Sequence, residues 1–194
     1  IVTINNQEDL DAFGTSISGC TTYTGGIKLN GFTPDPGKSD ITNLSPLSAL
    51  QTITGVFWVL DTDVTSLAGL NNLTSVGGGF LVQNNYILTN IDALFNLTTI
   101  SGYFLFSNNK ILQKIDGLAS LTTVNGNVNI SYNNNLTSCC GIFPLVYSNG
   151  ATGSIVFGPN NGAFNTAADV LNSGYISVNL NHCFTSLSDA ISYA

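Results

Sequence analysis

The chain has 194 residues, and its four lysines, absence of arginine and eleven acidic residues give a net charge of −7. This length suits one domain. Only 8% of the residues are charged, and so few cations argue against binding to nucleic acids or to anionic membranes. No apolar run approaches the ~20 residues that span a bilayer, so we expect no insertion of this segment into a membrane. The chain does not begin with Met, and we expect any export signal or anchor to lie outside it.

The first expected element is a short helix over residues 6–13. The segment NQEDLDAF places acidic residues in the first turn and spaces Leu10 and Phe13 three apart, which is typical of an amphipathic helix start. Residues 1–19 would then form an N-terminal cap, because the first strand of a stack stays unpaired without one.

A repeat of 24 residues dominates the chain from residue 20 to residue 145. Leu67, Ile91, Ile115 and Cys139 recur at that interval, within the segments VTSLAGLNNLTSVGGGFLVQNN, LTNIDALFNLTTISGYFLFSNN and LQKIDGLASLTTVNGNVNISYNN. Such a period predicts stacked coils. We therefore expect an all-β fold, a right-handed, leucine-rich-repeat-like β-solenoid of about six coils with an N-terminal helix and a C-terminal cap, in a single domain over residues 1–194.

One main strand is expected in each repeat, at residues 55–60, 78–83, 102–107 and 126–131. Alternating apolar residues should face the core from these strands: Phe57, Val59, Phe80, Val82, Phe104, Phe106, Val128 and Ile130. A glycine precedes each strand, and we expect it to turn a tight corner with a positive φ.

Asparagines follow the strands in two neighbouring rows. Asn85, Asn109 and Asn133 form one row, whereas the other ends in Tyr132. Since Tyr132 would be awkward at a buried corner, we expect the first row inside, where its amides can bond one another and the turning backbone.

The repeat degrades after residue 145. Residues 146–194 are expected to hold an irregular coil and the C-terminal cap, with a strand at 154–157, a last strand in GYISVNL and a short helix in FTSLSDAIS.

The four cysteines do not match a metal motif, because the chain has no CxxC and one histidine. We expect Cys140 to bond Cys183 and clamp the C-terminal cap, with Cys139 in place of Cys140 as the alternative, which suits an oxidising, extracellular setting. Cys139 is the less favoured partner because it falls at a core position. The remaining possibility is three free buried thiols, and Cys20, which aligns with a core row of leucines, is expected to be free and buried.

The repeats resemble the receptor L-domain family, the leucine-rich β-helical domains of insulin and epidermal growth factor receptors. The similarity is closer to bacterial secreted and cell-surface members with the pattern LTSLxGLxNLTSIGGxLxIxNN, and it covers residues 1–145 well and the tail loosely. The segments QEDLDAF…C…GGIKLNG and LTSCCGI…ISVNLNHCFTS also look like the ends of that family. The resemblance implies a secreted or cell-surface module that recognises proteins, without catalysis and without a cofactor.

The residues that alternate with the core residues should face outward on the main sheet. Large apolar side chains are unexpected there, and contiguous apolar patches usually mark contact surfaces. This predicts a ligand-binding face for a protein or a glycan, made of Lys28, Val56, Trp58, Leu81, Gln83, Tyr103, Leu105, Asn127 and Asn129. The alternatives are cover within the chain, by the loop FTPDPGKSD or by residues 146–165, and a surface without a partner.

Three other functions compete with this prediction. A self-assembling surface or filament protein would use the same patch, since a low charge opposes association only weakly. Ice binding would use threonine rows such as Thr74, Thr98 and Thr122, but the neighbouring row lies on the opposite face of a strand. Catalysis would need a constellation that one histidine and scattered carboxylates do not supply. Asp92 and Asp116 occupy equivalent positions, and paired carboxylates can hydrolyse glycosides, but aspartate at such a corner commonly bonds the amides of the turn. We therefore expect no enzyme, no cofactor and no metal site.

Overall fold

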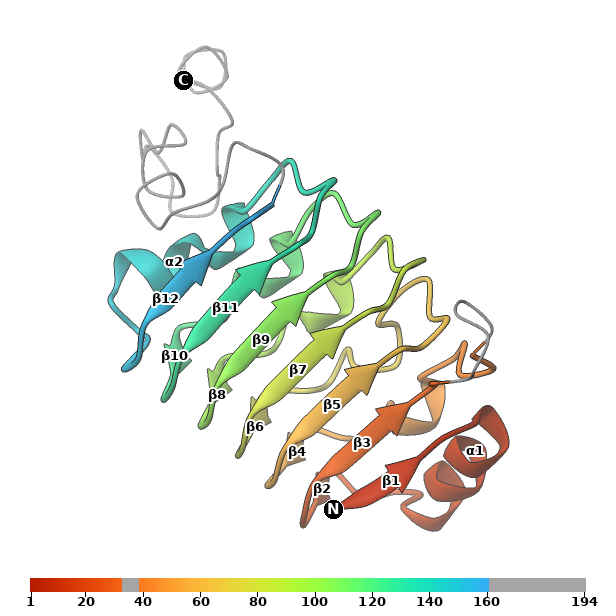
Figure 1. The fold of residues 1–194 in the computed structure, drawn as a ribbon. Coiled ribbons are helices and arrows are strands. Elements are labelled where there is room, and N and C mark those ends of the chain that lie inside the picture. Colours follow the sequence, from red (N-terminus) through yellow and green to blue (C-terminus); the bar gives the residue numbers. More distant parts are fainter. Residues whose placement is uncertain (33–38, 161–194) are drawn as a thin grey trace, which may run out of the picture.

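The computed structural model describes residues 1–32 and 39–160, which form two parallel sheets (Figure 1). The larger sheet has seven strands in the order β1-β3-β5-β7-β9-β11-β12. Its strands are β1 (Val2–Ile4), β3 (Ile27–Asn30), β5 (Phe57–Leu60), β7 (Phe80–Gln83), β9 (Phe104–Ser107), β11 (Val128–Ser131) and β12 (Ile155–Phe157). Successive repeats therefore lie side by side along the sheet.

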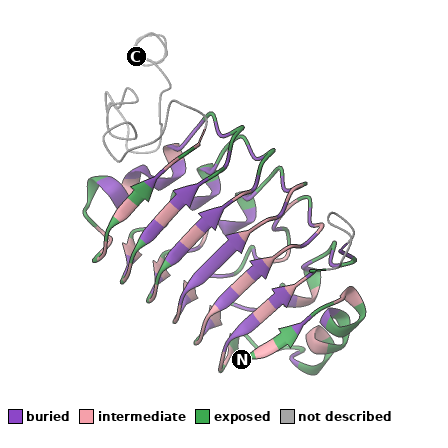
Figure 2. Cartoon of the chain, viewed as in Figure 1, coloured by how far each residue is buried: buried purple, intermediate pink, exposed green. Residues whose placement is uncertain are grey.

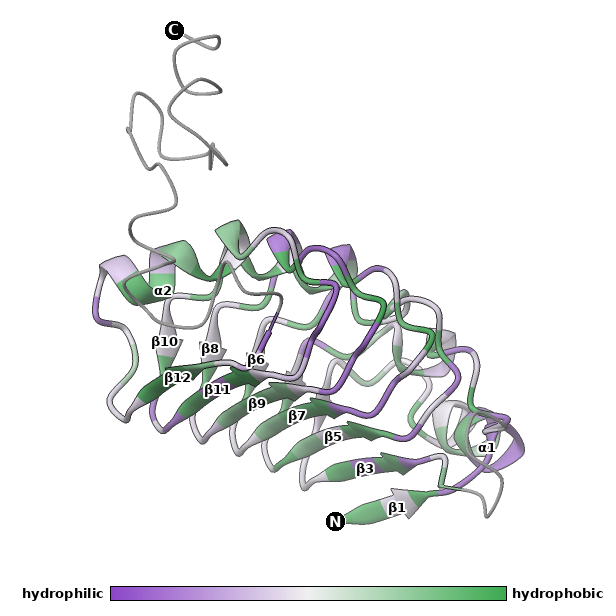
Figure 3. Cartoon of the chain, turned by 45° about the horizontal axis from the view of Figure 1, so that its top comes forward, coloured by the Kyte–Doolittle hydropathy of each residue, from purple (hydrophilic) through white to green (hydrophobic). Residues whose placement is uncertain are grey.

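The smaller sheet has five strands of two residues each, in the order β10-β8-β6-β4-β2. These strands are β2 (Thr22–Tyr23), β4 (Thr52–Ile53), β6 (Ser75–Val76), β8 (Thr99–Ile100) and β10 (Thr123–Val124). They lie on the same side of the larger sheet as the helical turns, and the second face of the larger sheet is not covered by them (Figure 3).

Helical segments follow five strands of the larger sheet, β1, β3, β7, β9 and β11. Two are α-helices, α1 (Gln7–Ser16) and α2 (Phe143–Tyr147), and four are 3₁₀ helices, η1 (Ser45–Leu47), η2 (Asp92–Leu94), η3 (Asp116–Leu118) and η4 (Cys140–Ile142). The N-terminal helix that we expected is α1, whose N-cap Asn6 accepts a hydrogen bond from the Asp9 amide at 2.8 Å.

The predicted fold class, an all-β right-handed β-solenoid, is wrong. The chain forms two parallel sheets with helices between them, an arrangement of the α/β kind. The reason lies in a second spacing inside the repeat, because Ile91, Leu94 and Leu97 are three residues apart and all buried. That spacing matches the three residues per turn of a 3₁₀ helix, whereas the 24-residue period alone suggested strand corners at these positions.

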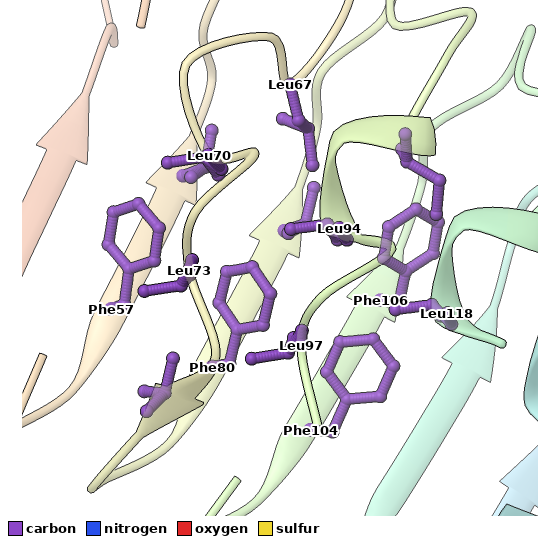
Figure 4. Packing of buried hydrophobic residues seen from close by; sticks show 14 of the residues in the cluster. Phe57, Leu67, Leu70, Leu73, Phe80, Leu94, Leu97, Phe104, Phe106 and Leu118 are labelled. Atoms are coloured by element: carbon purple, nitrogen blue, oxygen red, sulfur yellow. The ribbon is translucent and has the colours of Figure 1, made fainter. Parts of the chain in front are cut away.

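Buried residues occur along the larger sheet and along the helical turns (Figure 2), and the core consists of their apolar side chains. All eight residues predicted to face inward from the main strands are fully buried. Phe57 stacks on Phe80 with ring centroids 5.3 Å apart, and Phe80 packs against the tilted ring of Phe104 at 5.8 Å. Leucines of the turns pack against these rings (Figure 4). The alternation of apolar residues therefore predicted the core correctly.

The main strands end where the sequence predicted but begin two residues later, and the glycines explain the difference. Gly55 and Gly102 do not have the positive φ that we expected. A Cβ on either residue would lie 2.6 Å from backbone atoms of the preceding repeat, so glycine is needed there for close approach of the backbones. Positive φ occurs at Gly25 (125°), before β3, and after other strands, for example at Asn84 (61°) and Tyr132 (57°).

The inner asparagine row is confirmed. Asn85, Asn109 and Asn133 have no exposed surface. The Asn85 amide nitrogen donates to Asn109 Oδ1 at 3.3 Å and to the carbonyl of Val59 at 3.0 Å. Asn109 bonds Asn133 in the same way, while Tyr132 is 56% exposed. A continuous ladder of side-chain amides thus supplies hydrogen-bond partners to the buried backbone groups at these corners.

Only some of the predicted C-terminal elements fall within the described residues. β12 (Ile155–Phe157) corresponds to the strand expected at 154–157, and α2 fills the region where the repeat degrades. The last strand, the terminal helix and most of the C-terminal cap lie outside the described residues, so the division of residues 1–194 into one domain stays a prediction. Within residues 1–32 and 39–160, no helix has the length and apolar character needed to cross a membrane.

The structure contradicts one prediction about the cysteines and eliminates two of the alternatives. Cys20 is free, but it is exposed and not buried, because it follows α1 at the end of the sheets, where the preceding neighbour is a helix instead of another repeat. Cys139 is free and buried, which rules out its bond to Cys183. Cys140 is not a free thiol, which rules out the alternative of three free buried thiols. Its predicted partner Cys183 lies outside the described residues, so that pairing stays a prediction.

Candidate binding face

The outward residues of the seven-stranded sheet form rows that run across the strands, and we call this surface the outer sheet face. The strand pairing places its central row in register, at a spacing of ~4.8 Å between neighbours. That row consists of Thr3, Lys28, Trp58, Leu81, Leu105, Asn129 and Val156. Five of the nine predicted face residues, Lys28, Trp58, Leu81, Leu105 and Asn129, therefore lie next to one another.

The other predicted face residues flank this row. Gln83 lies on one side of it, in register with Leu60 and Ser107. Val56, Tyr103 and Asn127 come immediately before β5, β9 and β11. The Tyr103 ring leans over Gly79, since a Cβ placed on Gly79 would lie 2.7 Å from Tyr103 Cδ1. The missing side chain of Gly79 thus makes room for an aromatic ring on the neighbouring strand.

The apolar part of the outer sheet face is less exposed than the sequence suggested. Leu81 points outward but is only 9% exposed, whereas Tyr103 is 38% and Val156 is 48% exposed. Trp58 and Leu105, which flank Leu81 in register, are half-buried. Neighbouring side chains of the row therefore pack sideways against one another.

Trp58 lies beside the one charged residue of the seven strands, Lys28. The Lys28 ammonium lies 5.4 Å from the centroid of the Trp58 ring, a distance typical of a cation–π contact. One face of the indole ring is therefore occupied by a side chain of the neighbouring strand.

Two polar atoms of the central row have no hydrogen-bond partner. Trp58 Nε1 is a buried donor and Asn129 Oδ1 is a buried acceptor, and neither is satisfied within the described residues. Leaving such atoms unpaired is unfavourable. No pattern in the sequence indicated them, because their state depends on how the side chains pack.

Residues 146–160 do not fold over the outer sheet face. β12 extends the sheet beside β11 instead of crossing it, and α2 packs next to η4 on the helical side. Residues 33–38 of the loop FTPDPGKSD, and residues 161–165, lie outside the described residues.

The two carboxylates that we considered for catalysis accept hydrogen bonds at turns of the chain. Asp92 begins η2 and accepts a hydrogen bond from Asn90 Nδ2 at 2.9 Å. Asp116 begins η3 and accepts one from Ser138 Oγ at 3.1 Å. In the part of the chain that the structure describes, no three His, Cys, Asp or Glu side chains group as metal ligands would.

The hydroxyl rows lie on the outer side of the smaller sheet, where Thr52, Ser75, Thr99 and Thr123 are in register. Many of these hydroxyls bond within the chain. Thr52 and Ser75 bond each other at 3.0 Å, and Thr98 Oγ1 donates to the carbonyl of Thr74 at 3.1 Å. Each of these bonds uses part of the capacity of a hydroxyl to bind water.

A second exposed surface was not predicted. It lies at the corner after the main strands, where Ile87 is 41%, Ile111 is 40% and Tyr132 is 56% exposed. Lys110 Nζ lies 5.1 Å from the centroid of the Tyr86 ring at the same corner. The repeat alignment could have indicated it, because Ile87 and Ile111 occupy equivalent positions in a turn.

Comparison of this chain with protein-family models, with curated proteins and with solved structures finds no match. The resemblance to the receptor L-domain family therefore stays a prediction.

Proposed function

We propose that this chain is a non-catalytic binding or adhesion module, secreted or displayed on a cell surface, that recognises a protein or a glycan through the outer sheet face. The observation that carries the proposal is the central row itself. Trp58, Leu81 and Leu105 form a continuous apolar strip, and the polar residues Lys28 and Asn129 lie at its two ends. Such a strip gains most from a partner that is apolar in the middle and polar at the rim.

Rigid presentation is the proposed mechanism. Backbone hydrogen bonds to strands on both sides fix β5, β7 and β9, so contact costs little additional backbone ordering. Gln83 and Asn127 border the apolar strip, and their amides would select a partner by hydrogen bonding.

Two alternatives rank lower. Assembly into an array or filament through the same face is favoured by the low charge of the chain. Ice binding has less support, because the hydroxyls of Thr52, Ser75 and Thr98 already bond within the chain.

Binding of purified chain to immobilised cellulose, chitin, mannan, collagen and fibronectin tests the proposal. We expect one of these surfaces to retain the native chain and to lose at least ~90% of it after Trp58→Asp, because the charge would enter the apolar strip. Tyr147→Asp is the matched control, since Tyr147 is 70% exposed on α2, away from the sheet. Equal retention of the two variants would refute the outer sheet face as the binding surface.

A further inference from the structure

Four asparagines of the chain are followed directly by a glycine, at positions 30, 125, 149 and 161. In such a pair the backbone nitrogen of the glycine can attack the side-chain carbonyl carbon of the asparagine, because glycine has no Cβ to hinder the approach. The attack needs a glycine N–H without a hydrogen bond and a peptide unit that can rotate. The pair at positions 161 and 162 lies outside the described residues, so three pairs can be compared.

Backbone hydrogen bonds hold two of these pairs in place. The Gly31 N–H donates to the carbonyl of Leu60 at 2.9 Å, and the Gly150 N–H donates to the carbonyl of Leu145 at 2.9 Å. A reaction at either pair must first open a bond of the fold, and the free energy of that opening slows it.

The peptide unit between Asn125 and Gly126 lacks such bonds. Within residues 1–32 and 39–160, neither the Asn125 carbonyl nor the Gly126 N–H has a hydrogen-bond partner. The groups on both sides are anchored, since the Asn125 N–H donates to the carbonyl of Ile100 at 2.9 Å and the Gly126 carbonyl accepts from the Gly153 amide at 3.2 Å. This single unit can therefore rotate at the corner between β10 and β11 while the strands stay paired.

The free N–H is a property of this corner and not of every repeat. At the corresponding corners, the Gly55 N–H donates to the carbonyl of Gly25 at 2.8 Å, and the Gly78 N–H donates to the carbonyl of Gly55 at 3.0 Å. The side chain of Asn125 is exposed and makes no hydrogen bond within the part of the chain that the structure describes. Water can therefore reach the carboxamide.

We propose that Asn125 and Gly126 form a site of spontaneous covalent modification, at which Asn125 deamidates to aspartate and isoaspartate. The Gly126 nitrogen forms a bond to Asn125 Cγ, the bond from Cγ to Nδ2 breaks, and Nδ2 leaves as ammonia with the proton of the Gly126 N–H. Water then opens the cyclic succinimide at one of its two carbonyl carbons. One opening gives aspartate, and the other routes the backbone through Cβ and Cγ and gives isoaspartate. No atom is oxidised or reduced.

The modification alters the corner next to the outer sheet face and does not depend on the proposed function. Each event adds one negative charge to the chain. Isoaspartate also lengthens the backbone by one carbon between two anchored groups, since the Val124 and Val128 amides both donate to the segment that follows α2. Asn127 lies between them, and its Oδ1 accepts from the Ser154 amide at 3.0 Å. We expect isoaspartate to displace Asn127 and to weaken this bond.

Peptide mapping by mass spectrometry tests the site in the native chain. The purified protein is incubated at neutral pH and body temperature and then digested with pepsin in acid, where deamidation is slow. We expect ammonia loss and isoaspartate at Asn125 at least ~5-fold faster than at Asn30 or Asn149, because those pairs must open a hydrogen bond. In guanidinium-unfolded chain the three rates should become similar. Equal rates in the folded chain, or an Asn125 that stays intact while the unfolded chain reacts, would overturn the inference.

Asn125→Ser is the matched control variant. It reproduces Ser101 and Gly102, which occupy the same positions in the preceding repeat, so we expect it to fold like the native chain. Aged native protein should accept methyl groups from protein isoaspartyl methyltransferase, and aged Asn125→Ser should lose at least ~80% of that signal, in proportion to the ~5-fold difference in rate. An equal signal from both aged proteins would show that the reactive asparagine lies elsewhere.

Discussion

The Lys28 ammonium lies 5.4 Å from the centroid of the Trp58 ring, on the neighbouring strand of the outer sheet face. This contact covers one face of the indole, and the ring offers its remaining surface to a partner. A sugar that stacks on the covered face must first displace Lys28, whereas a flat apolar surface can pack on the row without moving it. The contact also makes Trp58, the single tryptophan of the chain, a direct reporter of this face.

Lys28→Ala should expose Trp58. Without the lysine stem and ammonium the ring meets water on that side, so we expect acrylamide to quench its fluorescence more strongly and the emission to move to longer wavelength. Lys110→Ala is the control, because Lys110 covers Tyr86 at the corner and not Trp58. Identical quenching of Lys28→Ala and the native chain would show that this contact is not formed in solution.

Asn109→Ala should strongly destabilise the chain. Asn109 Oδ1 accepts hydrogen bonds from the backbone amide and the side chain of Asn85, and Asn109 Nδ2 donates to the carbonyl of Val82. Truncation leaves these buried groups unpaired, and we expect the free energy of unfolding to fall by about 2–4 kcal/mol. Urea denaturation measures the change. Asn134→Ala, at an exposed position nearby, should change the free energy by less than ~0.5 kcal/mol, and a similar loss in both variants would contradict the role of the ladder.

Tyr132→Asn should stabilise the chain. Tyr132 has a φ of 57°, a conformation that asparagine adopts more readily than tyrosine. Asn84 and Asn108 take the same conformation in the preceding repeats, and Asn108 Nδ2 donates to Asn84 Oδ1 at 2.7 Å. An asparagine at 132 could extend that row, and we expect a gain of about 1 kcal/mol in urea denaturation. A loss of stability would mean that contacts of the Tyr132 ring stabilise the chain by more than its strained backbone destabilises it.

Cys139 should be inert at neutral pH although it is free. Burial, together with the negative charge of Asp116, raises the pKa of the Cys139 thiol to about 12, and only the thiolate reacts. At pH 8 we expect the exposed Cys20 to react with a thiol reagent and Cys139 to stay unmodified until the chain unfolds. Rapid modification of Cys139 in the folded chain would contradict its burial.

The raised pKa of the Cys139 thiol also makes the stability of the chain depend on pH. The folded pKa lies above the ordinary value of 9.0, so the stabilising contribution of this thiol is complete below pH 9. It is lost as the pH rises from there toward 12, because the unfolded chain releases the proton first. Cys139→Ala should remove this alkaline loss in urea denaturation between pH 8 and pH 11, and an unchanged pH profile would refute it.

The sequence predicted the inward row of the main sheet and the inner asparagines because each depends on a short pattern. Alternation decided that Phe57 and Phe80 face inward, and the bulk of Tyr132 decided which asparagine row is buried. The 3₁₀ helices were missed, although Ile91, Leu94 and Leu97 carry a spacing of three. A 24-residue period is compatible with strands or with helical turns at the corners, and the period alone does not distinguish them.

The binding face was only partly predictable. Register follows from the repeat, so the neighbours of Trp58 could be named in advance. Its contact with Lys28 and the unpaired Nε1 depend on side-chain rotamers, which a linear pattern does not encode. The lean of Tyr103 over Gly79 likewise requires knowing that the space above a glycine is vacant on the neighbouring strand.

Acrylamide quenching of Trp58 fluorescence, followed as the chain is concentrated and as each candidate partner is added in solution, tests the outer sheet face most directly. We predict that quenching falls whenever sedimentation shows association, because the partner covers the central row. A complex that forms while Trp58 stays equally accessible to acrylamide would show that the chain makes its contacts elsewhere.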